Sequence, residues 1–324
     1  MTQLIETYRG EALAWEADEL GHMNMRYYFA KTAEARAIFC TKLHLKDAYK
    51  ADGFSTLIPT RQHIKYHKEV RPGHGMVVRS GILELGENTM VLVHMITSPS
   101  GSSASGWTAQ SAGEGAGEGE ILSATIVETL EHVSRRTQTV FPWPQRVRMA
   151  AKPYLVDMPA AAAPRNIDLD EPIVDPTIAQ ADALDLPIIG QGMFEPSECD
   201  AFGIVSATSM IGRISNSAQH LKTAWPDLDF TGDSGLSGAL LEACARHRRW
   251  PRAGDCFVIR SGLRSVTTHT RELCHWILDP VTGKCWSSFV GVGCRFNLKT
   301  RKLVKVDQAT LDILWPGIVD GLKP

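Results

Sequence analysis

The residues best suited to chemistry lie in one short stretch of the sequence. An acid, Asp18, stands just before a glycine turn, and Gly21, His22 and Asn24 stand where a helical pattern begins. The first N–H groups of a helix have no partner within it and attract negative charge. An acid beside such a helix start resembles the machinery of acyl-transfer chemistry. Asp18 could equally cap the helix, as aspartate often does, and the local sequence leaves both interpretations open.

The composition sets the class of protein. A chain of 324 residues suggests two domains or one large one. Its 44% hydrophobic and 22% charged residues are typical of a globular protein with a sizeable core. The net charge of −2 gives no argument for nucleic acid or a membrane surface as partner. No apolar run approaches the roughly 18 residues of a membrane-spanning helix.

The cysteines and the N-terminus point to a reducing compartment. There are seven cysteines, an odd number, scattered without a Cys-x-x-Cys pair. This pattern suits free thiols better than disulfides or a zinc site. The first residues show no basic segment followed by an apolar one, so no signal peptide is recognisable. We therefore expect a cytoplasmic protein without a metal or cofactor.

The chain contains an internal repeat at an offset of 181 to 182 residues. Several matches occur in the same order in both halves, which argues for duplication of a unit of roughly 130 residues. The matches include Val77–Ile82 with Val258–Leu263, Val93–Ile96 with Cys274–Ile277, Asp18 with Asp200, and Gly21 with Gly203.

Both halves predict the same order of elements: a strand, a long helix, then strands joined by glycine or proline turns. Helical spacing of Met25, Phe29, Ala33, Ala37 and Cys40 favours a helix in the first half. The pattern indicates an α+β unit whose helix packs across one antiparallel sheet. The predicted first-half elements are a strand at 4–17, a helix at 25–43 and strands at 55–70, 76–86, 89–98 and 104–112. Their second-half counterparts are a strand at 191–199, a helix at 206–225 and strands at 236–248, 255–266, 269–279 and 284–297.

A linker is expected between the two units, over residues 113–187. It starts with an acidic glycine-rich loop at 113–120 and is rich in proline and alanine further on. Residues 121–138 could form a helix. The predicted domains are therefore 1–112 and 188–324.

The motif at the helix start resembles a known family. Asp18, Gly21, His22, Asn24 and Tyr28 match the Asp-x-x-Gly-His-x-Asn-x-x-x-Tyr signature of the 4-hydroxybenzoyl-CoA thioesterase branch of hotdog-fold thioesterases. Glu34-Ala35-Arg36 resembles the Glu-x-Arg that often follows on the central helix of this family, and Asp200–Val205 resembles its Asp-x-x-Gly-Ile-Val variant. Two fused copies resemble acyl-ACP thioesterases, which implies two tandem hotdog domains paired as a pseudo-dimer.

The resemblance implies roles for these residues. The acid, here Asp18, acts as nucleophile or as base for water, and the N–H groups around Gly21 and His22 hold the developing oxyanion. Gly21 would let the backbone approach the substrate closely. Asn24 and His22 would orient groups by hydrogen bonds, although His22 could be only structural. Glu34 and, in the second copy, Asp200 and Gly203 complete the set of catalytic candidates.

The second copy keeps the acid and the turn as Asp200 and Gly203 but loses the polar residues around them. His22 corresponds to Ile204, and Asn24 to Ser206. The second copy could be an inactive partner for packing or a second active site of the Gly-Ile-Val type. We expect one principal site, at Asp18.

Four basic residues could hold the phosphates of coenzyme A. Arg61, His63, Lys65 and His67 alternate along one predicted strand face. A solvated strand face is the simpler interpretation for any one of them.

Together these features predict an acyl-CoA thioesterase that releases free acid and CoA. Its partners would be an acyl-CoA or acyl-ACP substrate, with an intrachain pseudo-dimer and a possible homo-oligomer. The main alternative is a non-catalytic acyl-CoA or acyl-ACP binding module on the same fold.

Overall fold

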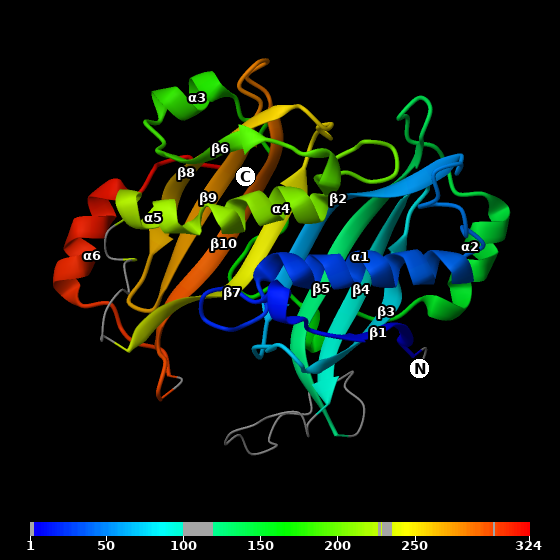
Figure 1. The fold of residues 1–324 in the computed structure, drawn as a ribbon, viewed down its shortest axis with the longest axis horizontal. Helices are drawn as coiled ribbons and strands as arrows, with labels where there is room; N and C mark the ends of the chain where they lie inside the picture. Colours follow the sequence, from blue (N-terminus) through cyan, green and yellow to red (C-terminus); the bar gives the residue numbers. More distant parts are fainter. Residues whose placement is uncertain (1–2, 100–118, 226–227, 229–234, 301) are drawn as a thin grey trace. The chain divides into compact units, whose positions relative to one another are not determined.

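The computed structural model describes residues 3–99, 119–225, 228, 235–300 and 302–324. The chain divides into two compact units, residues 1–163 and 164–324. Each unit is an antiparallel sheet with helices on it, shown in Figure 1. This confirms the predicted α+β class and the duplicated architecture. The expected pairing of the units as a pseudo-dimer concerns their relative placement and stays a prediction.

The first unit carries its long helix across a five-stranded sheet with the order β1-β3-β4-β5-β2. Figure 1 shows α1 lying across one face of these strands. The elements of this unit are β1 (Ile5–Glu11), η1 (Ala14–Glu16), α1 (Met25–Lys42), β2 (Ser55–Tyr66), β3 (Gly75–Leu85), β4 (Thr89–Pro99), β5 (Glu120–Ser134), α2 (Gln145–Ala151), η2 (Lys152–Tyr154) and η3 (Ala160–Ala162).

The second unit repeats this plan with the strand order β7-β10-β9-β8-β6. Its strands agree with the predicted ranges to within about three residues at most ends, because their turns carry clear glycine and proline signals. The elements are α3 (Ile178–Ala183), β6 (Ile188–Met193), η4 (Pro196–Glu198), α4 (Ala207–Asn216), α5 (Ala218–Ala224), β7 (Leu236–His247), β8 (Cys256–Val266), β9 (Thr270–Leu278), β10 (Cys285–Asn297), α6 (Gln308–Leu314) and η6 (Trp315–Gly317).

Strand pairing confirms the repeat at the level of register. Tyr8 of β1 pairs with Val78 of β3, and Gly190 of β6 pairs with Ile259 of β8. Both edge strands carry an irregularity one residue earlier, at Thr7 and at Ile189. The two halves therefore correspond residue by residue along these strands, at the offsets found in the sequence.

The helix expected at 121–138 is wrong, because residues 121–134 form most of strand β5 and a turn follows it. This strand hydrogen-bonds to β4 on one side and to β2 on the other. Most of its side chains are buried on both faces, so it lacks the two-residue alternation that marks a strand with one solvated face. The strand expected at 104–112 and most of the glycine-rich loop lie outside the described residues.

The predicted linker is divided between the two units. Its first part covers the sheet of the first unit: Val156 N donates to Ile82 O, and Lys65 Nζ donates to Ala163 O at 2.6 Å. Its second part is held by the second unit, where the N–H groups of Arg165 and Asn166 donate to the buried carboxylate of Glu242. The proline-rich segment therefore packs partly against the first unit and partly against the second.

Helix α1 packs one face against the sheet. Its buried residues recur at three- and four-residue spacing, as a helix face requires. This face differs from the predicted one, because Met25, Ala33 and Ala37 are only half-buried. Phe39 and Cys40 join Leu57, Met90 and Leu92 of the sheet in one apolar cluster. The buried positions of α1 are Tyr28, Phe29, Lys31, Thr32, Ala35, Arg36, Phe39 and Cys40.

The single helix expected at 206–225 is broken in the structure. Helix α4 ends at Asn216, and α5 starts at Ala218. Between them Ser217 has φ −98° and ψ 0° and donates its Oγ hydrogen to Arg213 O at 2.8 Å. Such back-bonding by serine bends helices, and the sequence pattern alone did not reveal it.

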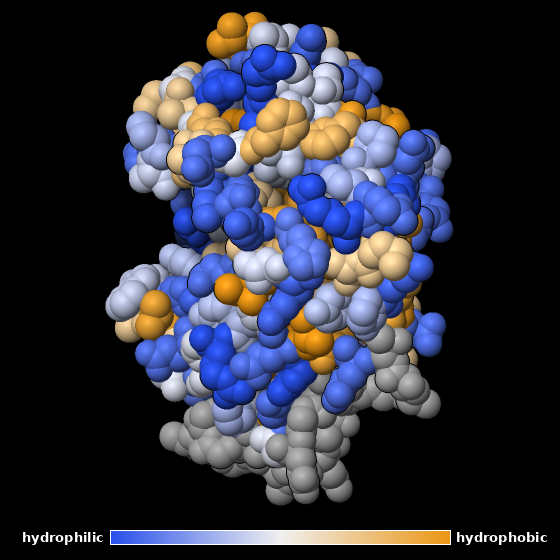
Figure 2. Space-filling view, turned by 90° about the vertical axis from the view of Figure 1, so that its right-hand side faces the viewer, coloured by the Kyte–Doolittle hydropathy of each residue, from blue (hydrophilic) through white to orange (hydrophobic). Residues whose placement is uncertain are grey.

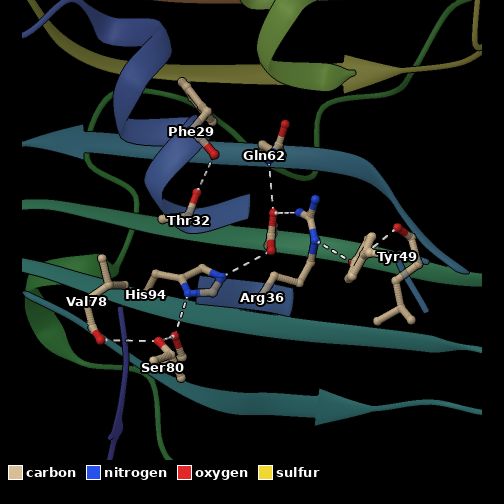
Figure 3. Close-up of polar contacts among 11 residues, drawn as sticks. Phe29, Thr32, Arg36, Tyr49, Gln62, Val78, Ser80 and His94 are labelled. Carbon is tan, nitrogen blue, oxygen red and sulfur yellow. Dashed lines mark hydrogen bonds and ion pairs between the residues drawn. The ribbon is translucent and has the colours of Figure 1, made fainter. Parts of the chain in front are cut away.

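A buried polar chain joins α1 to the sheet of the first unit (Figure 3). Arg36 Nη1 donates to Glu128 Oε2 at 2.7 Å, and His94 Nε2 lies 3.1 Å from Glu128 Oε1. Gln62 Nε2 donates to the same carboxylate at 3.0 Å. Because the side chain of Glu128 has no exposed surface, its charge is balanced entirely by these partners.

The chain continues from His94 to the edge of the sheet. His94 Nδ1 lies 2.7 Å from Ser80 Oγ, which lies 2.7 Å from Thr7 Oγ1. At the other end, Arg36 Nε donates to Tyr49 Oη at 2.8 Å. Strands β1, β3, β4 and β5 and helix α1 are therefore connected by one line of polar contacts.

The second unit keeps only part of this chain. His275 Nδ1 lies 2.7 Å from Ser261 Oγ, as in the first unit. The strand register places Gly291 where the first unit has Glu128, and the sequence offset places Ala218 where it has Arg36. Burial lowers the pKa of His275 to about 4, so this histidine is neutral at physiological pH. The ion pair under the helix belongs to the first unit.

The side of the first unit that carries α2 is mostly hydrophilic, with apolar residues in small separate groups (Figure 2). Among the described residues, none of the helices combines the length and the apolar composition that crossing a membrane requires.

The first prediction concerns the buried ion pair. Glu128→Gln leaves the Arg36 charge buried without a counter-charge, and we expect the first unit to lose about 3–5 kcal/mol of stability. The double variant Arg36→Met/Glu128→Gln should recover part of this loss, since neither charge of the pair then remains buried. Urea unfolding with hydrogen exchange on α1 peptides measures both. A loss below about 1 kcal/mol in the single variant would contradict the role given to this pair.

The second prediction concerns the stability of the first unit at acidic pH. Burial alone would raise the pKa of Glu128, but the Arg36 charge and the His94 hydrogen bond outweigh it and lower the pKa from 4.5 to about 2. A lowered pKa contributes stability that is present above pH 4.5 and is lost as pH falls towards 2. We expect the first unit to lose stability in this window, and Glu128→Gln to remove that part of the pH dependence. Urea midpoints measured at several acidic pH values test this.

Candidate active site

The carboxylate of Asp18 is fixed in a tight turn before α1. Its Oδ1 accepts hydrogen bonds from Leu20 N at 2.9 Å and His22 N at 3.2 Å. Its backbone closes the same turn, since Asp18 N donates to His22 O and Gly21 N donates to Asp18 O. Oδ2 makes no hydrogen bond within the described part of the chain. One oxygen of this half-buried acid therefore sets its position, and the other is available.

Glycine is required at the centre of this turn. Gly21 has φ +75°, in the left-handed region that other residues adopt only at a cost. An added β-carbon would meet no atom within 4 Å. The conformation, and not a lack of space around the backbone, selects glycine here.

Asn24 is the N-cap of α1. Its Oδ1 accepts from Arg26 N at 3.1 Å, and its own N–H donates to Glu16 O. Asn24 therefore fixes the helix start as its cap, and its predicted orienting role in catalysis stays a prediction.

The predicted oxyanion donors are occupied in this structure. The N–H groups of Gly21 and His22 both donate to Asp18. The helix start still offers Met25 N–H, the first within α1, which makes no hydrogen bond to any described residue. The sequence gives no signal for this donor, because it belongs to the backbone.

The ring of His22 is buried beneath the turn. Its Nε2 lies 3.0 Å from Glu69 Oε2 and 3.4 Å from an Arg71 nitrogen. Met23 N donates to Val70 O nearby, so the segment after β2 supports the turn. His22 thus connects the turn to that segment.

The second unit reproduces the turn almost atom for atom. Asp200 Oδ1 accepts from Phe202 N at 2.8 Å and from Ile204 N at 3.1 Å, and Gly203 has φ +71°. Ser206 replaces Asn24 as N-cap and accepts from Ser209 N. What the second unit lacks is the His22 ring, because Ile204 stands there. The turn is therefore a shared structural device, and the polar surroundings distinguish the first copy.

A second ion pair is also shared between the units. Lys31 Nζ lies 2.7 Å from Glu16 Oε1 in the first unit, and Arg213 pairs with Glu198 at the matching positions of the second. Each acid also accepts from the backbone N–H three residues earlier, at Leu13 and at Glu195. This pair ties the 3-10 helix before the turn to the helix after it.

Glu34 does not join this site. It is exposed on α1, ten residues beyond Asn24, which is about 15 Å along a helix. The structure brings Asp18, Gly21, His22 and Asn24 together.

The four basic residues differ in their access to solvent. Gln62 of β2 reaches Glu128 under α1, so its neighbours Arg61 and His63 and the next alternate residue, Lys65, point to the opposite face. There His63 is 1% exposed and Lys65 is 7% exposed. Arg61 is half-buried, and His67 is exposed just beyond β2. A stripe of four solvated cations is not present.

Sequence reasoning missed the buried chain that holds α1. Ser80 and His94 lie within the repeated segments, and their counterparts Ser261 and His275 make the same contact. The recurrence of serine and histidine at matching positions of both halves was the signal from which their contact could have been predicted. Glu128 was missed because its strand was interpreted as a helix.

Comparison with known proteins finds a family model that matches part of the chain. The model of the thioesterase-like superfamily matches residues 12–151, most of the first unit. The first unit therefore matches the family that the resemblance implied. No curated protein sequence matches the chain.

Solved structures resemble the chain over both units. A protein described as an oleoyl thioesterase from Lactobacillus plantarum is 11% identical, with a TM-score of 0.62 over 90% of this chain and 96% of that one. The 12:0-ACP thioesterase from Umbellularia californica is 10% identical, with a TM-score of 0.62 over 89% and 93%. An acyl-ACP thioesterase from Bacteroides thetaiotaomicron is 10% identical, with a TM-score of 0.56 over 88% and 96%. At these identities the likeness establishes the tandem fold.

The third prediction uses the two turn glycines as a matched pair. Gly21→Ala and Gly203→Ala both place a β-carbon in open space at positive φ, so each should cost about 1–2 kcal/mol of stability. If Asp18 alone carries activity, only Gly21→Ala should also lower the turnover of an acyl thioester, because it disturbs the Asp18 turn. Thermal unfolding and thiol release measure the two effects. Equal losses of activity in both variants would contradict a single site at Asp18.

Proposed function

We propose that this protein is an acyl thioesterase that hydrolyses an acyl-CoA to free acid and CoA, with Asp18 as base or nucleophile. The observation that carries the proposal is the Asp18 carboxylate. Its Oδ1 is fixed by two N–H groups of the turn before α1, and its Oδ2 is left available. It lies in the unit that the model of the thioesterase-like superfamily matches.

As a base, Asp18 Oδ2 would take a proton from water, and the resulting hydroxide would attack the thioester carbonyl carbon. The C–S bond would then break, the acid would form, and the leaving thiolate would take up the proton. As a nucleophile, Oδ2 would attack the same carbon and expel the thiolate, and water would then hydrolyse the mixed anhydride. Both routes place negative charge on the former carbonyl oxygen.

That charge needs a donor, and Met25 N–H is the one that the helix start leaves available. It would act together with the positive end of the 18-residue helix α1. We therefore place the oxyanion site at Met25 rather than at the N–H groups of Gly21 and His22. Asn24 and His22 would act by holding the turn and the helix start in position.

Phosphate groups of the thiol carrier would meet Arg61 and His67. These are the two residues of the proposed basic stripe that solvent reaches. Lys65 is bound to Ala163 O, and His63 is buried, so neither is included in the proposed phosphate site. An acyl-ACP carries the same phosphopantetheine thioester and remains an alternative substrate.

A specific observation favours the second candidate, a non-catalytic acyl-CoA or acyl-ACP binding module. The Asp200 turn has the same geometry, although Ile204 and Ser206 stand where the first unit has His22 and Asn24. The turn therefore keeps its geometry without the polar residues of the first unit. A turn that is retained for structure alone would fit a binding module.

The fourth prediction separates these functions. Asp18→Asn keeps an oxygen acceptor for the turn but removes the charge, and we expect a loss of turnover of about 100-fold or more. Asp200→Asn, the matched control, should stay close to wild type. The measurement is thiol release from a panel of short, branched, aromatic and long acyl-CoAs and from acyl-ACP.

Loss of turnover only in Asp200→Asn would place the chemistry in the second unit. If the wild-type protein binds acyl thioesters but releases no thiol from either carrier, it is a binding module and the enzymatic proposal is wrong.

A further inference from the structure

One arginine at the start of α1 has no counter-charge. Arg26 is half-buried, and its guanidinium makes no hydrogen bond or ion pair with any residue that the structure describes. Its Nε is buried without an acceptor. This cation is therefore partly removed from water with nothing to balance it, which is unfavourable unless a ligand supplies an anion.

The place of Arg26 in the helix adds to this cost. It is the second residue of α1, and the N-terminus of a helix carries partial positive charge, so a cation is disfavoured there. The first turn of α1 contains no acidic residue that would compensate it. An anion beside Arg26 would be attracted by the guanidinium and by the helix start together.

The contacts of Arg26 place its side chain on the side of the Asp18 turn. The guanidinium carbon lies 5.2 Å from the centroid of the Tyr27 ring. The hydroxyl of Tyr27 lies 3.5 Å from Trp15 O, within the 3-10 helix η1 that precedes the turn. Both side chains therefore lean back from α1 towards the segment that carries Asp18, as side chains at a helix N-terminus do.

The second unit keeps the turn without this cation. At the offset of 182 residues Arg26 corresponds to Thr208, and Tyr27 to Ser209. The Asp200 turn nevertheless has the same hydrogen bonds as the Asp18 turn. Arg26 is therefore not required to build the turn. An unpaired cation in an unfavourable place that the scaffold does not need indicates a role in binding.

The place of Arg26 in the chain decides which anion it can meet. It directly follows Met25, whose N–H is the proposed oxyanion donor, and consecutive Cα atoms are about 3.8 Å apart. A carboxylate a few carbons from the reacting carbonyl is within reach of an arginine side chain there. The phosphates of the thiol carrier are separated from the thioester by the whole pantetheine arm, which is much longer than that side chain.

We propose that Arg26 binds a carboxylate at the far end of the acyl group, so that the site prefers thioesters of short dicarboxylic acids to neutral acyl thioesters of the same length. The planar guanidinium can hold such a carboxylate by two parallel hydrogen bonds. Its charge also offsets the repulsion between this group and the carboxylate of Asp18. The inference rests on the proposed thioesterase function, because it is the Met25 oxyanion site that places the substrate.

Turnover of a matched pair of substrates tests the proposal. Thiol release by the full chain is measured with succinyl-CoA and butyryl-CoA, whose acyl chains have the same length. We expect kcat/KM to be higher for succinyl-CoA by about tenfold or more, as a charge-assisted hydrogen bond allows. Arg26→Met should remove this preference, and Thr208→Met, the matched control in the second unit, should keep it. A ratio that is unchanged in Arg26→Met would overturn the proposal.

Substrates without phosphate distinguish the two sources of an anion. The N-acetylcysteamine thioesters of the same two acids lack the phosphates of the carrier, and the preference for the succinyl group should persist with them. If Arg26→Met instead weakens both CoA thioesters equally and neither of the N-acetylcysteamine thioesters, Arg26 binds a carrier phosphate and the proposal is wrong.

Binding measurements separate this inference from the proposed function. Calorimetry on Asp18→Asn, which slows hydrolysis, compares the affinities of succinyl-CoA and butyryl-CoA with and without Arg26→Met. If the wild-type protein releases no thiol but succinyl-CoA binds several-fold more tightly and Arg26→Met removes the difference, the enzymatic proposal fails and this one holds. Equal affinities for the two thioesters would overturn it.

Thermal unfolding checks that the variant folds. Because the charge of Arg26 opposes the helix dipole, Arg26→Met should not lower the unfolding midpoint. Should this variant fail to fold, Arg26→Gln replaces it, with the same expected loss of preference for the succinyl group.

Discussion

The buried charge of Glu128 is the constraint on which the arrangement of the first unit depends. A carboxylate without solvent contact requires partners from every side. Arg36 comes from α1, His94 from β4 and Gln62 from β2. The position and rotation of α1 on the sheet are therefore fixed by directional contacts, whereas apolar packing alone would tolerate small shifts. The position of the Asp18 turn is fixed together with that of α1, because the N–H donors of the turn and the N-cap Asn24 belong to the segment that leads into this helix.

The sequence predicted the elements whose ends carry local signals. Glycine turns, the N-cap at Asn24 and the duplicated segments act over a few residues, so they can be recognised without tertiary structure. β5 was missed for the opposite reason. It is bonded on both sides and buried on both faces, and its pattern around Glu128 reflects partners from other elements. Ser217 likewise breaks its helix through a contact with Arg213 that helical periodicity does not encode.

The candidate site was predictable in its residues but not in its hydrogen bonds. The motif located Asp18, Gly21, His22 and Asn24 correctly within one turn. It could not show that Asp18 itself occupies the N–H groups of Gly21 and His22. Backbone donors are assigned only when the chain path is known, and for this reason the free N–H of Met25 had no signal in the sequence.

The two copies differ most where the first is most tightly constrained. With Gly291 in place of Glu128, this position of the second sheet holds no carboxylate that must be met from the helix, so nothing requires an arginine at Ala218. The helix can then break at Ser217 without leaving a buried ion. Gly190, in the place of Tyr8, lets the broken helix lie close to the edge strand, because an added β-carbon there would be 2.2 Å from Ser217 Oγ. Removing one buried carboxylate therefore allows the helix break, and the glycine beside it lets Ser217 pack against the edge strand.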